Sequence, residues 1–543
     1  MHRSLYEAFC HTASEHADRP AWLLPSAHGF ESIDWKLFQQ HTDRLALWLS
    51  KNGIRPADRI VNLQPNSAQW AMLDLACSAL GAIHSPIDPR WNDRQIASAI
   101  ESLEPHAIFS TRALDGLSGR TKLPSPMRID QAIEQATELA SPTQSLKWRD
   151  TLEPNLTANI LWTSGTSADP KGVMLSHSNL LSNAMAKLDA MPQFPEDMRL
   201  NLLPFAHAYA RTCELTAWIL SGSAMACVST SQALIDTAKL LCPSLINAVP
   251  SVYEFMLHRA DEAPSNRSQA DLKSVLGGRI RQLASGGAAI SERIRERFAI
   301  DGLPIFQGYG LTEASPVVCS NRASNERSAP QPGEAIQLGS IQLRPIQLDP
   351  TQPGQPMLEG VGPPVRGVEL RVDSQERLWV KGPGVMQGYW RNEIATEQRI
   401  QNGWLDTGDC IAVDTADTDG ASDRWKPIRI AGRADDTQVL STGHKFAPRL
   451  LEHPIEQIPG VIQCIVVGTG RRRPLAIVNA NQTTHSDPQR LLAQIRSLLC
   501  ELPEHLQVSE VLLSYEPWTQ ENGLRHWKGG VNRREIARRF APE

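Results

Sequence analysis

The chain has 543 residues, of which 41% are hydrophobic and 21% are charged, and its formal net charge is −5. This length is too great for one hydrophobic core and predicts several compact units, while the slightly acidic balance gives no electrostatic reason to expect nucleic acid binding. Nine cysteines without a C-x-x-C pair favour a reducing compartment over a disulfide framework.

The chain begins without the apolar core of a signal peptide. Its most apolar stretch, residues 70–87, is interrupted by Asp74 and His84 and falls short of a membrane-spanning helix. We therefore expect a cytoplasmic protein, and we leave open both peripheral membrane contact and the oligomeric state.

Helical and strand patterns alternate along the first 150 residues. Apolar periodicity predicts helices over residues 35–52 and 67–80 and strands over residues 59–63 and 107–110. Further on, it predicts helices at 179–188 and 252–259 and a strand at 244–249. Strands separated by helices indicate parallel βαβ units, so the expected fold class is α/β, with sheets layered with helices.

Two irregular segments divide the rest of the chain. Residues 320–362 are rich in Pro, Gln and Gly and are expected to include a surface insertion. Residues 428–436 form a polar, glycine-bearing joint where a hinge would lie. We predict a large N-terminal domain of residues 1–430 and a small mobile C-terminal α/β domain of residues 431–543, with strands at 462–467 and 475–479.

A polar turn at residues 161–173 follows a buried strand pattern. Hydroxyls and exposed backbone N–H groups in such a loop can wrap a polyphosphate, and Lys171 adds a positive charge. The order differs from the common phosphate loop, because Lys171 precedes Gly172 instead of following it. The candidate phosphate-binding residues are Thr163, Ser164, Gly165, Thr166, Ser167 and Lys171.

Residues 307–315 and 403–409 form two more glycine-bearing motifs. In the first, the glycines flanking Tyr309 let its ring lie close to backbone, which suits stacking on a nucleobase. Thr312 offers a hydroxyl to a phosphate, and Glu313 offers a hard oxygen ligand to Mg²⁺. In the second, Asp409 can accept hydrogen bonds from ribose hydroxyls. Either motif alone would also suit an ordinary turn or loop.

Together, and in this order, the motifs resemble the acyl-adenylate-forming, or AMP-binding, superfamily, over nearly the whole chain. The resemblance implies ATP binding by the phosphate loop and by Gly286, Gly287, Ala288, Gly308, Tyr309, Gly310, Thr312, Asp409 and Arg433. It also implies Mg²⁺ on Glu313 and Thr166, a hinge at Asp435, and Gly443 beside a tunnel for CoA. Residues 203–212 resemble the segment whose histidine, here His207, lies between the phosphate loop and the carboxylate pocket.

The end of the chain departs from the superfamily pattern. The superfamily lysine that contacts the substrate carboxylate and α-phosphate is replaced by Gly530, and the nearest lysine is Lys528. Two extended residues span at most about 7 Å, so Lys528 would compensate if Gly529 and Gly530 fold the chain back. We therefore take Lys528, Thr166, Glu313 and His207 as the candidate catalytic residues. Ala168, where glycine is usual, is a milder departure.

The resemblance is nearest to fatty acyl-CoA synthetases, through Arg211-Thr212-Cys213-Glu214 and residues 436–441. It implies an ATP-dependent ligase that joins a medium- or long-chain fatty acid to CoA through an acyl-adenylate. One alternative keeps the adenylate but uses an acceptor other than CoA, or activates a β-hydroxy acid. A second alternative is a nucleotide-binding, catalytically weak relative, which Gly530 would favour.

Overall fold

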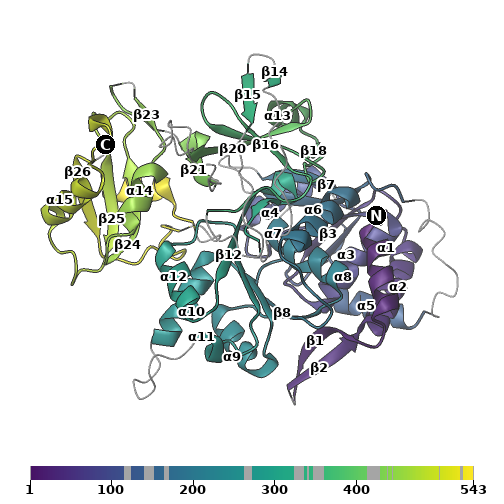
Figure 1. Ribbon diagram of the computed structural model, residues 1–543. Helices are drawn as coiled ribbons and strands as arrows, with labels where there is room; N and C mark the ends of the chain where they lie inside the picture. Colours follow the sequence, from purple (N-terminus) through teal and green to yellow (C-terminus); the bar gives the residue numbers. More distant parts are fainter. Residues whose placement is uncertain are drawn as a thin grey trace.

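The computed structural model describes residues 2–27, 29–114, 124–139, 152–163, 170–261, 272–322, 336–338, 341–345, 360–412, 428–436, 438–442, 444–500, 502–525 and 530–541. Within these residues, three large sheets and their covering helices build the N-terminal part, and two smaller sheets build the C-terminal part (Figure 1). Within the same residues, no helix has the length and apolar character needed to cross a membrane.

One sheet contains most of the strands between residues 198 and 320, in the order β13-β12-β11-β10-β8-β9-β1-β2. The strands from β8 to β12 pair in parallel, as the sequence predicts. The strand bounds are β1 Pro20–Ser26, β2 Gly29–Asp34, β8 Met198–Asn201, β9 Ala224–Cys227, β10 Leu245–Ala248, β11 Gln282–Ser285, β12 Ile305–Gly310 and β13 Val317–Ser320. The helices between them are α9 Ser231–Leu241, α10 Pro250–Asp261, α11 Leu272–Val275 and α12 Glu292–Ile300.

A second sheet runs in the order β18-β7-β6-β4-β3-β5 and holds the strand before the phosphate loop. Its parallel part joins β3 to β4 and β5, and its antiparallel part joins β6 to β7, with Thr163 opposite Lys171. The bounds are β3 Arg59–Leu63, β4 Ile83–Pro86, β5 Ala107–Ser110, β6 Thr157–Thr163, β7 Lys171–Ser176 and β18 Gly388–Tyr389. The hairpin therefore brings both ends of the loop 164–170 together.

A third sheet is antiparallel, in the order β14-β15-β16-β17-β20-β19, with β21 beside β20. The expected βαβ pattern does not extend to it, because short connections such as the turn at Glu376, with φ +58°, join neighbouring strands directly. Its bounds are β14 Ile336–Leu338, β15 Ile341–Pro345, β16 Glu369–Val372, β17 Arg377–Lys381, β19 Ile400–Gln401, β20 Trp404–Ala412 and β21 Arg429–Arg433. Most of the predicted insertion at 320–362 lies outside the described residues.

The remaining N-terminal helices cover these sheets. Their bounds are α1 Leu5–Glu15, α2 Trp35–Lys51, α3 Ala68–Leu80, α4 Asp93–Leu103, α5 Ile129–Thr137, α6 His177–Ala190, α7 Ala208–Ala210, α8 Ala217–Ser221 and α13 Glu393–Arg399. A π-helical turn at Arg211–Thr216 joins α7 to α8. The apolar stretch at 70–87 forms α3 and β4, and α3 is apolar on nearly all sides because all of its residues except Gln69 are buried among its neighbouring helices and β4.

The C-terminal part has its own core, in which Leu451, Ile455, Val478, Leu491 and Ile495 are buried together. Its strands and helices gather on one side of the molecule, away from α1 and α2 (Figure 1). Their bounds are β22 Gln438–Val439, β23 Lys445–Phe446, α14 Arg449–Glu456, β24 Val461–Val467, β25 Leu475–Ala480, α15 Pro488–Leu498, β26 Glu510–Ser514 and α16 Arg533–Phe540. The two strands predicted here lie within one residue of β24 and β25. The predicted domain boundary at 430 falls inside β21, and the hinge residue Asp435 lies in the 3₁₀ turn Ala434–Asp436 that follows.

Candidate active site

A cavity of about 1200 Å³ collects residues from the first two sheets, the third sheet and the C-terminal part. Its lining includes the sequence-predicted residues Thr163, Lys171, His207, Gly286, Gly287, Gly308, Tyr309, Gly310, Thr312, Glu313 and Arg433. Ala288 is exposed and is not part of this lining. Six further predicted residues lie outside the described residues, namely Ser164, Gly165, Thr166, Ser167, Gly443 and Lys528.

The β6–β7 hairpin places a cation at one wall of the cavity. Thr163 Oγ1 donates to the Lys171 carbonyl oxygen at 3.4 Å, which ties the two ends of the predicted phosphate loop. The Lys171 ammonium lies 5.3 Å from the centre of the Tyr389 ring, and both residues line the cavity. A cation over an aromatic face is stabilised without being neutralised, so Lys171 keeps its positive charge for a bound anion.

Tyr309 and Asp409 meet beside the same cavity. The Tyr309 hydroxyl donates to Asp409 Oδ2 at 2.5 Å, and Arg433 Nη1 lies 3.2 Å from Asp409 Oδ1. Burial raises the pKa of the Asp409 carboxyl, and the Arg433 charge and the Tyr309 hydroxyl oppose that rise without cancelling it. Three residues that the sequence assigned separately to adenine and ribose therefore form one connected group, although they come from β12, β20 and β21.

Gly310 is needed for the shape of the loop after β12. A Cβ atom at Gly310 would lie 1.9 Å from the Pro316 carbonyl oxygen, a distance that no side chain tolerates. Two buried polar side chains form hydrogen bonds with the backbone of the same loop. Asn183 of α6 bonds the Val317 backbone at both N–H and C=O, and Thr212 Oγ1 donates to the Ser315 carbonyl oxygen at 2.7 Å. The loop that carries Thr312 and Glu313 is thus attached to two helical segments.

Glu313 presents a carboxylate to the cavity. The Tyr389 hydroxyl donates to Glu313 Oε1 at 2.8 Å, and burial together with the Glu313 charge raises the pKa of Tyr389. Among the residues described, no group of three or more His, Cys, Asp or Glu side chains could hold a metal ion. A carboxylate next to the Thr312 hydroxyl nevertheless fits Mg²⁺, which prefers a few hard protein oxygens together with substrate phosphates.

His207 is fixed at the cavity wall by a buried carboxylate. His207 Nε2 lies 2.9 Å from Asp88 Oδ2, and Arg90 Nη2 lies 2.6 Å from the same oxygen. Burial alone would raise the pKa of Asp88, but the hydrogen bonds from His207 and Arg90 hold it well below its usual value. The structure therefore places His207 in the lining of the cavity and adds Asp88 and Arg90 as its supports. In the sequence, these two supports are marked only by the short string Asp88-Pro89-Arg90, which follows β4.

A deeper part of the cavity is mainly apolar. Tyr209 forms one wall, and a Cβ atom at Gly286 would lie 3.0 Å from its ring, so a larger residue there would require the ring to shift by a few tenths of an ångström. Behind it, Met191, Ala284 and Phe306 pack together and line the cavity. This part has the character of a pocket for the organic portion of a substrate.

The C-terminal part contributes the segment after β26. Trp518, Thr519, Gln520, Glu521 and Arg525 line the cavity, and Arg525 Nε donates to Gln463 Oε1 at 3.1 Å. Sequence reasoning did not single out Arg525, because nothing in its neighbourhood distinguishes it from a solvated arginine.

Gly530 is exposed, and a Cβ atom there would meet nothing within 4 Å. The position of the missing superfamily lysine is therefore open space.

Comparison with known proteins shows the family of the chain. The family model described as AMP-binding enzyme matches residues 9–390, and that of the AMP-binding enzyme C-terminal domain matches residues 435–543. The long-chain-fatty-acid–CoA ligase FadD15 of Mycobacterium bovis is 26% identical over 482 residues, 78% of this chain and 73% of that protein. A feruloyl-CoA synthase of Amycolatopsis sp is 26% identical over 535 residues, 95% of this chain and 97% of that protein.

Among solved structures, the ATP-bound MatB from Rhodopseudomonas palustris superposes with a TM-score of 0.76 at 21% identity, and 99% of each chain is covered. This similarity confirms the expected fold, with a large N-terminal domain and a separate C-terminal domain. The relatives also confirm, at the level of the family, the expectation of an AMP-forming enzyme of the acyl-CoA synthetase class. For this family, ATP binding and the use of CoA as a co-substrate are supported, and one solved structure of similar fold contains bound ATP. With both family models matched in order along the chain, the protein belongs to the AMP-binding enzyme family.

Proposed function

We propose that this protein activates a carboxylic acid with ATP through an acyl-adenylate and transfers the acyl group to CoA, with a medium- or long-chain fatty acid as the substrate. The observation that carries the proposal is the connected group of Tyr309, Asp409 and Arg433 beside a cavity that continues into an apolar pocket. Such a site holds a nucleotide at one end and an acyl chain at the other.

In the first half-reaction, a carboxylate oxygen attacks the α-phosphorus of ATP and pyrophosphate leaves. Lys171 and the predicted loop residues hold the β- and γ-phosphates, while Asp409 accepts from the ribose hydroxyls. Glu313, with Thr166 as predicted, would hold Mg²⁺, which supplies charge neutralisation at the phosphates. The buried Asp88 keeps the His207 ring directed at the cavity between the phosphate and acyl ends.

In the second half-reaction, the CoA sulfur attacks the acyl carbonyl carbon and AMP leaves. The proposed movement is a rotation of the C-terminal domain at Asp435, which lies just after β21. Burial of the adenylate between the two steps protects it from water.

A cation from the C-terminal domain is needed where charge builds on the attacked phosphate. Lys528 is the sequence-based candidate, and Arg525 is a second candidate because it lines the cavity. Removal of a well-placed charge-stabilising group typically costs about 10²–10³ in rate. Lys528→Ala and Arg525→Ala, compared in acid-dependent pyrophosphate release, identify which residue acts, and a loss of that size in one variant is the expected result.

The experiment that tests the proposed function is pyrophosphate release from MgATP over a series of fatty acids, with and without CoA. Acid-dependent release, with acyl-CoA formed when CoA is present, is the expected result. Release without thioester would favour a different acceptor. Binding of ATP without release for any acid would contradict the proposal and favour a catalytically weak relative.

A further inference from the structure

A lysine lies in the wall of the deep, apolar part of the cavity. Lys187, near the end of α6, has only 3% of its surface exposed and lines the cavity. It contacts Met191, which packs with Ala284 and Phe306, and the Cys213 side chain lies near it. An ammonium in such surroundings is costly unless a hydrogen-bond acceptor or an anion compensates it.

Within the described part of the chain, Lys187 has no carboxylate partner within ion-pair distance. Its hydrogen bond goes to Met191 Sδ at 2.8 Å, and a thioether sulfur is a weak acceptor. Burial lowers the pKa of Lys187 to about 8, so that the ammonium is still the main form at pH 7.

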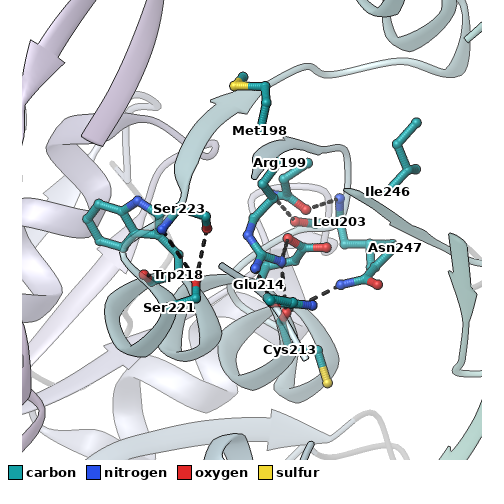
Figure 2. A network of polar contacts seen from close by, with 12 residues as sticks. Met198, Arg199, Leu203, Cys213, Glu214, Trp218, Ser221, Ser223, Ile246 and Asn247 are labelled. Carbon is teal, nitrogen blue, oxygen red and sulfur yellow. Dashed lines mark hydrogen bonds and ion pairs between the residues drawn. The ribbon is translucent and has the colours of Figure 1, made fainter. Parts of the chain in front are cut away.

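The nearby carboxylate of Glu214 is already engaged by another cation. Arg199 Nη1 lies 2.8 Å from Glu214 Oε2 and donates to the Cys213 carbonyl oxygen at 3.1 Å, as Figure 2 shows. Both side chains are fully buried. With Lys187 included, this region holds two cations and one carboxylate. Its charge would therefore be balanced by one further anionic or strongly hydrogen-bond-accepting group.

Two residues that pack with Met191 lie on strands that lead to the predicted nucleotide site. Phe306 precedes Tyr309 by three residues on β12, and Ala284 precedes Gly286 by two residues at the end of β11. At about 3.3 Å per residue, Ala284 and Phe306 lie about 7–10 Å along the chain direction from Gly286 and Tyr309. A medium-length acyl group would span this distance.

We propose that the acyl substrate carries an oxygen acceptor at the end remote from its reacting carboxylate, and that the Lys187 ammonium donates a hydrogen bond to that oxygen. This inference rests on the proposed function and narrows its substrate class to oxygenated acids, with a hydroxyl, oxo or second carboxylate group. Lys187 then determines specificity and takes no part in the adenylation chemistry.

The test compares matched acids in acid-dependent pyrophosphate release. Hexanoate, octanoate and decanoate are each set against the ω-hydroxy acid and the α,ω-dicarboxylic acid of the same length. Hydrogen bonds to a buried charged group predict that kcat/KM favours the oxygenated acid of the best length by about 10- to 100-fold over the plain acid. Preference for the dicarboxylate over the hydroxy acid would indicate an anionic distal group, and the reverse order a neutral one.

Lys187→Met keeps an unbranched side chain one atom shorter and removes its charge, and Lys239→Met on the exposed face of α9 is the control. The expected result is that Lys187→Met lowers kcat/KM for the oxygenated acid at least tenfold and leaves or raises that for the plain acid, while Lys239→Met changes neither. Preference of the unaltered enzyme for plain acids at every length would overturn the inference without using any variant, and would leave the proposed function standing. Absence of release with every acid would instead overturn the proposed function.

Discussion

Replacement of Asp74 by asparagine is expected to destabilise the N-terminal domain strongly. Asp74 Oδ2 lies 2.7 Å from Arg211 Nη2, and neither side chain has more than 1% of its surface exposed. Asp74 Oδ1 also accepts from Asn159 at 3.1 Å and lies 2.8 Å from His84 Nδ1. Asparagine keeps the shape of the side chain, so the variant removes the charge that balances Arg211 and creates no cavity.

The magnitude follows from the geometry. Two unit charges about 4 Å apart, at an effective dielectric constant of about 20, attract each other by about 4 kcal/mol. This agrees with the cost of about 3–5 kcal/mol for removing one partner of a buried ion pair. Burial alone would raise the pKa of Asp74, yet the Arg211 charge and the contact with His84 hold it well below its usual value.

Urea unfolding followed by tryptophan fluorescence measures the effect on the free energy of unfolding. We expect Asp74→Asn to lose about 4 kcal/mol, and Asp74→Asn with Arg211→Met to lose less than the sum of the single variants, because the double variant leaves no unpaired charge. Asp236→Asn, at an exposed position of α9, is the control, and its free energy of unfolding should stay within about 0.5 kcal/mol of that of the unaltered protein. A loss below about 1 kcal/mol for Asp74→Asn, or additive effects, would refute the reasoning.

Three further outcomes are expected. Gly310→Ala should weaken ATP binding more than about tenfold, because its Cβ atom would collide with the Pro316 carbonyl oxygen and displace the loop; calorimetric titration with ATP measures this, and an unchanged affinity would contradict it. His177, whose Nδ1 accepts from the Leu5 N–H at 3.4 Å, has its pKa lowered by burial to about 4, below the 6.5 of the unfolded chain. Its stabilising contribution is therefore complete above pH 6.5, and about 3 kcal/mol of it is lost as the pH falls toward 4. Urea unfolding at several pH values should show that the free energy of unfolding falls less steeply over this range in His177→Asn. Lys171→Met should lower pyrophosphate release about 10²-fold, and a smaller change than tenfold would argue against a phosphate contact.

The secondary structure of the N-terminal part was largely predictable from the sequence. The strands at Arg59–Leu63 and Ala107–Ser110 have the predicted bounds, and the helix at Trp35–Lys51 ends one residue before the predicted end. These segments are defined by local apolar periodicity and a glycine stop. The antiparallel third sheet was not predicted, because strand pairing depends on contacts between segments that local patterns do not encode.

The candidate site was predicted as a set of residues but not as a set of contacts. Motif spacing indicated Tyr309, Asp409 and Arg433 separately, whereas the hydrogen bond and ion pair that join them depend on how β12, β20 and β21 meet. Asp88 was missed because its partner His207 is 119 residues away. Lys187 was missed because a lysine on a helix ordinarily lies on a solvated face.

The segment Arg211–Glu214 shows how one short string contributes to three parts of the structure. Arg211 binds Asp74 of α3, Thr212 holds the Ser315 carbonyl of the loop that carries Glu313, and Glu214 binds Arg199 of β8. Because the three side chains are fully buried, a displacement of the π-helical turn would disturb the loop that carries Glu313 and the contacts to α3 and β8 together. The string whose resemblance predicted a fatty acyl-CoA synthetase therefore has a positioning role in this fold, since its side chains tie together α3, β8 and the loop that carries Glu313.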